Sequence, residues 1–116
     1  VSHDPSKQKD HPMIYDHRTY CCRPGTIKKH LALYAEFGFP AQRRILGEPV
    51  IYAQVETGDV NSFVHIWAYE DAADRAARRA QMAADPEWQA YLKKSAEAGY
   101  LVSQTNKILL PVPLEG

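Results

Sequence analysis

The chain has 116 residues, of which 45% are hydrophobic and 24% are charged, as expected of an ordinary globular protein with one hydrophobic core. Fourteen basic residues balance fourteen acidic ones, so the sequence predicts neither a nucleic-acid partner nor attraction to an acidic membrane surface. No apolar run approaches the roughly 20 residues of a membrane span, and the polar start lacks the apolar segment of a secretory signal.

Cys21 and Cys22 are the only cysteines, and they are adjacent. A disulfide between neighbours is strained and rare, so we expect two free thiols in a reducing compartment. The sequence therefore predicts a cytoplasmic protein.

Residues 1–12 are polar and contain two prolines, so we interpret them as an N-terminal extension of a single domain over residues 13–112. His3 and His11 lie in this extension, but two loop imidazoles without a third ligand do not define a metal site. We predict no metal site and no cofactor.

Aromatic and β-branched residues predict a first strand over residues 13–22. Apolar residues at helical spacing then predict a helix from residue 27 to about residue 37. Gly38 and Pro40 are expected to end this helix, and residues 39–49 are expected to form an irregular connection with at most one helical turn.

A second strand is expected over residues 50–57 and a third over residues 63–69, joined as an antiparallel hairpin by a short turn at residues 57–62 with Gly, Asp and Asn. Side chains alternate across a strand, so the third strand has two faces. One is aliphatic: Val64, Ile66 and Ala68. The other is an aromatic row with one imidazole: Phe63, His65, Trp67 and Tyr69.

Asp71 is expected to cap a helix over residues 72–84, whose alanine-rich face would lie close to the sheet and whose arginines would face solvent. Asp85 and Pro86 restart the helix, which runs to Gly99. Residues 100–110 form the last strand.

The order β-α-β-β-α-β predicts an α+β, ferredoxin-like fold: a four-stranded antiparallel sheet with its helices on one face and the first and third strands at its centre. We place the aromatic row on the helix-free face and infer that a second copy of the chain covers it. Two such sheets would form a dimeric α/β barrel, with a cavity between sheet and helices or inside the barrel.

Five segments resemble the NIPSNAP family: Tyr15–Tyr20, Arg23–Gly25, Asn61–Asp71, Arg75–Arg79 and Asp85–Tyr91. The resemblance extends over nearly all of residues 13–111. It implies membership of the dimeric α/β-barrel group, which also contains small monooxygenases, haem-degrading and haem-binding proteins, and lactone isomerases. It implies a pocket but carries over no catalytic residues.

The candidate site combines imidazoles, aromatic rings and arginines. His65 and His17 are the candidate catalytic acid–base groups, on neighbouring strands. The aromatic rings of the candidate ligand pocket are Tyr15, Tyr20, Trp67 and Tyr69. Arg18 or Arg43 could hold a substrate carboxylate, or each could pair with a nearby acidic side chain.

These residues predict a small protein that binds a small molecule beside the sheet, with cofactor-independent monooxygenation or isomerisation as the reaction if it is an enzyme. One alternative is a non-catalytic dimeric interaction module, in which the aromatic row is only an interface. A second is haem binding through one of the histidines.

Overall fold

The computed structural model describes residues 13–115. Its elements, in chain order, are β1 (Ile14–Cys22), α1 (Ile27–Leu33), the π-helix η1 (Tyr34–Gly38), α2 (Phe39–Leu46), β2 (Ile51–Gln54), β3 (Ser62–Tyr69), α3 (Ala72–Ala83), α4 (Pro86–Ala98) and β4 (Leu101–Leu109). The expectations for residues 1–12, including His3 and His11, lie outside the described residues.

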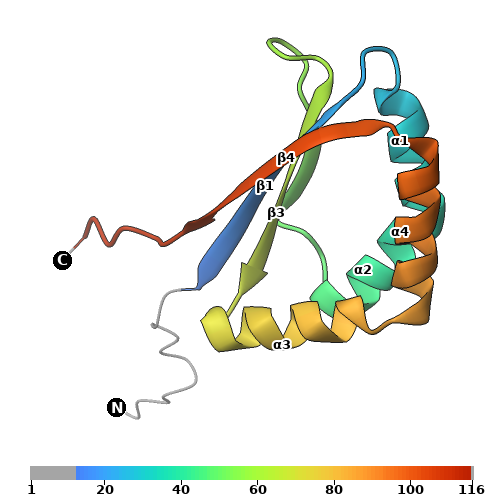
Figure 1. The fold of residues 1–116 in the computed structure, drawn as a ribbon. Coiled ribbons are helices and arrows are strands. Elements are labelled where there is room, and N and C mark those ends of the chain that lie inside the picture. The colour runs from blue at the N-terminus through green and yellow to red at the C-terminus, as the bar shows by residue number, and fades with distance from the viewer. Residues whose placement is uncertain (1–12, 116) are drawn as a thin grey trace.

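The sheet has the strand order β2-β3-β1-β4, and each neighbouring pair is antiparallel. Strands β1 and β3 are central, and the helices lie together on one side of the sheet (Figure 1). The predicted ferredoxin-like α+β fold is therefore confirmed.

The starts and ends of the last two helices follow the predicted capping residues. Asp71 accepts a hydrogen bond from the Asp74 backbone N–H at 2.8 Å, and Asp85 accepts one from the Trp88 N–H at 3.0 Å. Gly99 ends α4 in the left-handed conformation, with φ of 66°, which glycine adopts without steric cost. Such caps satisfy backbone groups that the helix itself leaves unpaired.

The prediction that Gly38 and Pro40 end the first helix is wrong, because the chain stays helical through η1 and α2. Pro40 lies in the first turn of α2, where a missing N–H costs no hydrogen bond of that helix. Gly38 is required for packing: a Cβ there would lie 2.9 Å from Tyr34 Cδ1 and 3.0 Å from Tyr91 Cγ. Glycine therefore lets two aromatic rings approach the helix backbone.

The aromatic row of β3 faces the helices, which corrects the prediction that it lies on the helix-free face. Its four side chains are at most 3% exposed: Phe63, His65, Trp67 and Tyr69. Side chains from the helices, such as Met82, join them in the core. The alternation of side chains along a strand shows which residues share a face, but it does not show which face the helices cover. Because both faces of β3 are apolar, the sequence does not distinguish between them.

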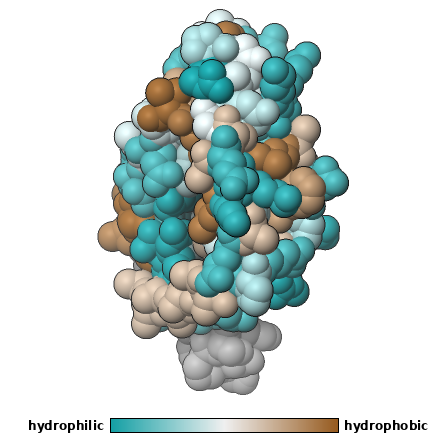
Figure 2. All heavy atoms as spheres, turned by 45° about the vertical axis from the view of Figure 1, so that its right-hand side comes forward, coloured by the Kyte–Doolittle hydropathy of each residue, from teal (hydrophilic) through white to brown (hydrophobic). Residues whose placement is uncertain are grey.

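Helix α3 also has the reverse of its predicted orientation. Arg75 Nε donates to the buried Asp16 carboxylate at 3.0 Å, and Arg78 Nη1 donates to the Leu46 carbonyl at 3.1 Å. The alanines are exposed instead: Ala73, Ala76, Ala77, Ala80 and Ala84. In Figure 2, weakly hydrophobic side chains gather at the lower end of the view, where α3 lies. This helix meets the sheet through long side chains, not through close backbone contact.

Within residues 13–115, no helix is long and apolar enough to cross a lipid bilayer.

Candidate functional site

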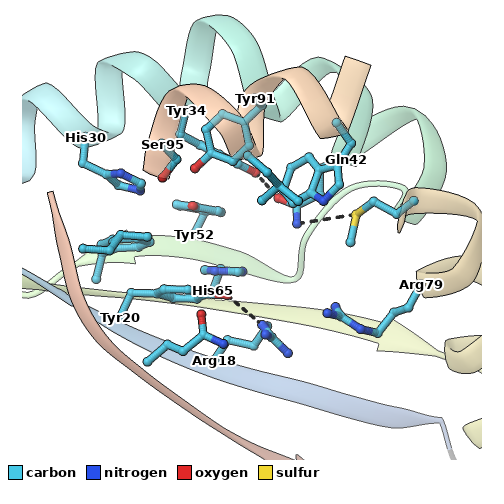
Figure 3. Close-up of a pocket in the computed structure, with 16 residues that line it drawn as sticks. Arg18, Tyr20, His30, Tyr34, Gln42, Tyr52, His65, Arg79, Tyr91 and Ser95 are labelled. Atoms are coloured by element: carbon cyan, nitrogen blue, oxygen red, sulfur yellow. Dashed lines mark hydrogen bonds between the residues drawn. The ribbon is translucent and has the colours of Figure 1, made fainter. Parts of the chain in front are cut away.

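A cavity of about 250 Å³ lies between the sheet and the helices, and we call it the sheet–helix cavity (Figure 3). The sheet contributes Arg18, Tyr20, Tyr52, Phe63 and His65 to its lining. The helices contribute, among others, His30, Tyr34, Gln42, Arg79, Met82 and Tyr91. The volume is close to the lower end of the range for small-molecule sites, which is about 300–1,000 Å³.

Aromatic rings from three strands form a nearly parallel stack along one side of the cavity. The His65 ring lies between Tyr52, with ring centres 4.6 Å apart, and Tyr20, with ring centres 5.0 Å apart. Tyr52 in turn stacks on Tyr34 at 5.0 Å. The sheet register produces this arrangement, because Tyr52 is the cross-strand partner of His65 on β3.

His65 is held in one neutral tautomer. Its Nδ1 accepts a hydrogen bond from the indole Nε1–H of Trp67 at 2.6 Å. An indole nitrogen can only donate, so the neutral imidazole carries its own proton on Nε2. Burial, with the positive charges of Arg18 and Arg79, lowers the pKa of His65 to about 3. At neutral pH His65 is therefore an uncharged group that offers an Nε2–H.

Arg18 is fixed by a buried network on the helix side of β1. Its Nη1 donates to Asp16 Oδ2 at 3.1 Å, and its Nε donates to the Tyr20 hydroxyl at 3.1 Å. Asp16 is fully buried and also accepts hydrogen bonds from Arg75 and Asn106, both at 3.0 Å. Burial raises the pKa of Asp16, but these donors outweigh it and hold the pKa below its usual value. The network therefore fixes the positions of Arg18 and of the Tyr20 hydroxyl, and both residues line the cavity.

The helical side of the cavity carries polar groups that the sequence does not single out. Tyr34 donates a short hydrogen bond to Gln42 Oε1, and Gln42 Nε2 lies 3.9 Å from the Met82 sulfur. Burial raises the pKa of Tyr34 and lowers the pKa of His30. Both groups are therefore neutral at ordinary pH, and His30 is a second uncharged imidazole at the cavity.

Arg79 points from α3 toward the cavity (Figure 3). Within residues 13–115 its guanidinium makes no salt bridge, whereas Arg18, Arg75 and Arg78 each do. No signal in the sequence separates Arg79 from its neighbours, because its role depends on how α3 turns against the sheet.

The sequence-predicted site residues fall into three groups. Arg18, Tyr20 and His65 line the cavity, and Trp67 and Tyr69 lie in the core beside it. Tyr15 and His17 lie on the opposite, helix-free face of the sheet, because His65 is paired with Arg18 in the register. Arg43 is exposed, forms a salt bridge with Glu48 and does not line the cavity. His65 and His17 therefore do not share a site.

Histidine, cysteine and acidic side chains do not cluster in the described part of the chain. In residues 13–115 no group of three or more of them lies close enough to hold a metal ion.

The fold is that of a ferredoxin-like α+β protein, with an aromatic cavity between sheet and helices. A model of the NIPSNAP family matches residues 15–114, so the chain belongs to the NIPSNAP family. A NipSnap homolog from Dictyostelium discoideum is 32% identical over 101 residues, which are 87% of this chain and 44% of that protein. The chain thus spans less than half the length of this curated relative.

Solved structures agree with the family and with the fold. An uncharacterized NIPSNAP-like domain protein from Burkholderia xenovorans has a TM-score of 0.82 and 40% identity, covering 91% of this chain and 90% of that one. A putative antibiotic biosynthesis monooxygenase from Nitrosomonas europaea has a TM-score of 0.61 at 12% identity, covering 90% of this chain and 94% of that one. The second likeness concerns the fold alone.

Proposed function

We propose that the sheet–helix cavity binds a small planar molecule. The observation that carries this proposal is a 250 Å³ space bordered by aromatic rings and by a neutral, fixed His65. An apolar cavity of about 150 Å³ already takes up benzene, so one substituted aromatic ring fits the available volume. The same volume is small for a porphyrin, and we do not propose haem as the ligand.

For a reaction, we propose that the bound molecule is isomerised by proton transfer, or is oxygenated with molecular oxygen as the oxidant, without a cofactor. Both begin with loss of a proton from carbon, which leaves negative charge on a neighbouring oxygen. The Nε2–H of His65 would stabilise that oxygen, because a preorganised donor needs no reorganisation when the charge develops. His65 is thus proposed as a donor, not as the base, and the neutral His30 is the candidate proton acceptor.

Binding is tested by filling the cavity. Ser95 lines the cavity from α4, so Ser95→Phe should weaken binding of neutral and anionic one-ring aromatic molecules at least about tenfold by occupying their space. The indole N–H signals of Trp67 and Trp88 report binding by NMR, because Trp67 contacts His65 and Trp88 lines the cavity.

Ala96→Phe is the matched control, since the exposed Ala96 is the next residue on α4 and lies outside the cavity lining. It should leave binding unchanged. If no one-ring aromatic shifts the indole signals of the unsubstituted chain, the ligand-binding proposal fails and a non-catalytic interaction module becomes the better account.

We also propose that the chain forms a homodimer through the helix-free face of the sheet. This face carries no helix. Its part on β2 and β3 is apolar, with Ile51, Ala53, Val64, Ile66 and Ala68, whereas its part on β1 and β4 also carries His17, Thr19, Thr105 and Lys107. An apolar patch on two adjacent strands is unusual against water, and two-fold dimers are the commonest soluble oligomers, so we propose that a second copy covers it. With two free thiols, Cys21 and Cys22, we further propose a cytoplasmic location.

Ile66→Asp should convert the dimer to a monomer, because it places a charge at the centre of the proposed interface. Sedimentation equilibrium measures the mass directly. Val60→Asp, at an exposed position in the turn before β3, should leave the dimer intact. A monomeric unsubstituted chain at micromolar concentration would contradict the dimer.

A further inference from the structure

The two charged side chains that line the sheet–helix cavity are both arginines. Its lining contains Arg18 and Arg79 and no Asp or Glu. Arg18 is 7% exposed and is already paired with Asp16. Arg79 has no carboxylate partner within the described residues, so it supplies a positive charge that the protein itself does not neutralise. A partly buried unpaired charge is costly, and an anion placed beside it recovers that cost.

Arg79 is presented by a helix that is anchored near it. Arg75 lies four residues before Arg79 on α3, on the same side of the helix, and Arg78 lies one residue before it. The first is bonded to Asp16 and the second to the Leu46 carbonyl. These anchors fix the helix against the sheet and against the end of α2. The helix held in this way directs Arg79 toward the cavity (Figure 3).

We propose that Arg79 binds the carboxylate of a small aromatic acid whose ring occupies the sheet–helix cavity. This inference rests on the proposed binding function and specifies its ligand class. The planar guanidinium has a fork of N–H donors that matches a carboxylate in two parallel hydrogen bonds. The aromatic lining suits a flat apolar body, and the volume suits one ring with its substituents.

The neighbouring groups agree with an anionic ligand. His65 is uncharged and offers an Nε2–H, so it can donate a hydrogen bond to a ligand oxygen. An acceptor at this place would instead repel a carboxylate. Burial is the main cause of the low pKa of His65; Arg18 and Arg79 lower this pKa further, and the Asp16 carboxylate that is paired with Arg18 raises it. Among residues 13–115 Arg18 has a carboxylate partner and Arg79 has none, so Arg79 is the charge that favours an anion over an isosteric neutral molecule.

The test compares benzoate with benzamide, which have nearly the same shape but differ in charge. We expect the unsubstituted chain to bind benzoate more tightly, as measured by NMR titration of the two tryptophan indole N–H signals. Arg79→Gln should weaken benzoate binding about tenfold to a hundredfold, the usual effect of losing hydrogen bonds to a charged group. It should leave benzamide binding nearly unchanged, so that the preference for the anion disappears.

Two further variants complete the design. Arg43→Gln removes an exposed arginine outside the cavity and should leave benzoate binding unchanged. Arg79→Lys keeps the positive charge but lacks the two parallel N–H donors of the guanidinium, so it should retain part of the preference for benzoate. It also serves as the test if Arg79→Gln does not fold, which the dispersion of the NMR spectrum reveals.

The outcomes separate this inference from the proposed function. Equal affinity of the unsubstituted chain for benzoate and benzamide, or unchanged benzoate binding by Arg79→Gln, would overturn the role of Arg79 while leaving a ligand-binding cavity. Failure of both probes to shift either indole signal would overturn the proposed function and this inference together.

Discussion

Replacement of Asp16 by Asn should lower the free energy of unfolding by about 3–5 kcal/mol, the usual effect of removing one partner from a buried ionic network. Asp16 is fully buried and accepts hydrogen bonds from Arg18, Arg75 and Asn106. Asparagine has nearly the same shape, but it leaves two guanidinium groups without a counter-charge. Urea unfolding at neutral pH measures the loss.

Glu48→Gln is the control, because it removes the carboxylate of an exposed salt bridge with Arg43 and should not measurably change stability. The pKa of Asp16 lies below its usual value in the folded chain, so its contribution is present above about pH 4 and is lost as the pH falls through the lower folded value. An Asp16→Asn variant as stable as the unsubstituted chain would mean that the network contributes nothing to stability.

Stability should fall as the pH is lowered from 6.5 toward 3, with His65 as a main cause. Its pKa of about 3 in the fold lies below the usual 6.5, so in this window the unfolded chain binds a proton that the folded chain does not. One such proton corresponds to a slope of about 1.4 kcal/mol per pH unit. His65→Gln should remove about 2–3 kcal/mol of the stability loss between pH 6 and pH 4.

Glutamine does not titrate, and its side-chain oxygen can still accept a hydrogen bond from the Trp67 indole N–H. This variant therefore removes the protonation at residue 65 and keeps the hydrogen bond. Urea unfolding at a fixed protein concentration should give parallel stability curves for the two proteins above pH 7, where neither state binds the extra proton. The same slope in both proteins between pH 6 and pH 4 would show that His65 is not buried as a neutral group.

The order of elements could be predicted from the sequence because the local signals agree. The hairpin turn before Ser62, the caps at Asp71 and Asp85, and Gly99 after α4 all act over a few residues, and all occur where expected. Gly38 misled the prediction, since the same absence of a Cβ serves either a helix end or the close approach of Tyr34 and Tyr91. Only the tertiary structure separates these roles.

The candidate site was harder to predict because it depends on which side of each element faces the helices. His65, Tyr20 and Arg18 were found, since aromatic and charged residues on central strands stand out. The sequence predicts that Arg79 faces solvent, and nothing in the sequence singles out His30. Both reach the cavity only because of how α3 and α1 dock on the sheet, which no spacing in the sequence expresses.

The central claim is that the space between sheet and helices is a ligand site for an aromatic acid. A crystal structure of the chain grown with benzoate tests it most directly. Our account predicts the benzoate ring in the sheet–helix cavity beside His65, with its carboxylate within hydrogen-bonding distance of the Arg79 guanidinium. A cavity without benzoate, or benzoate bound only at Arg43 or on the helix-free face, would contradict it.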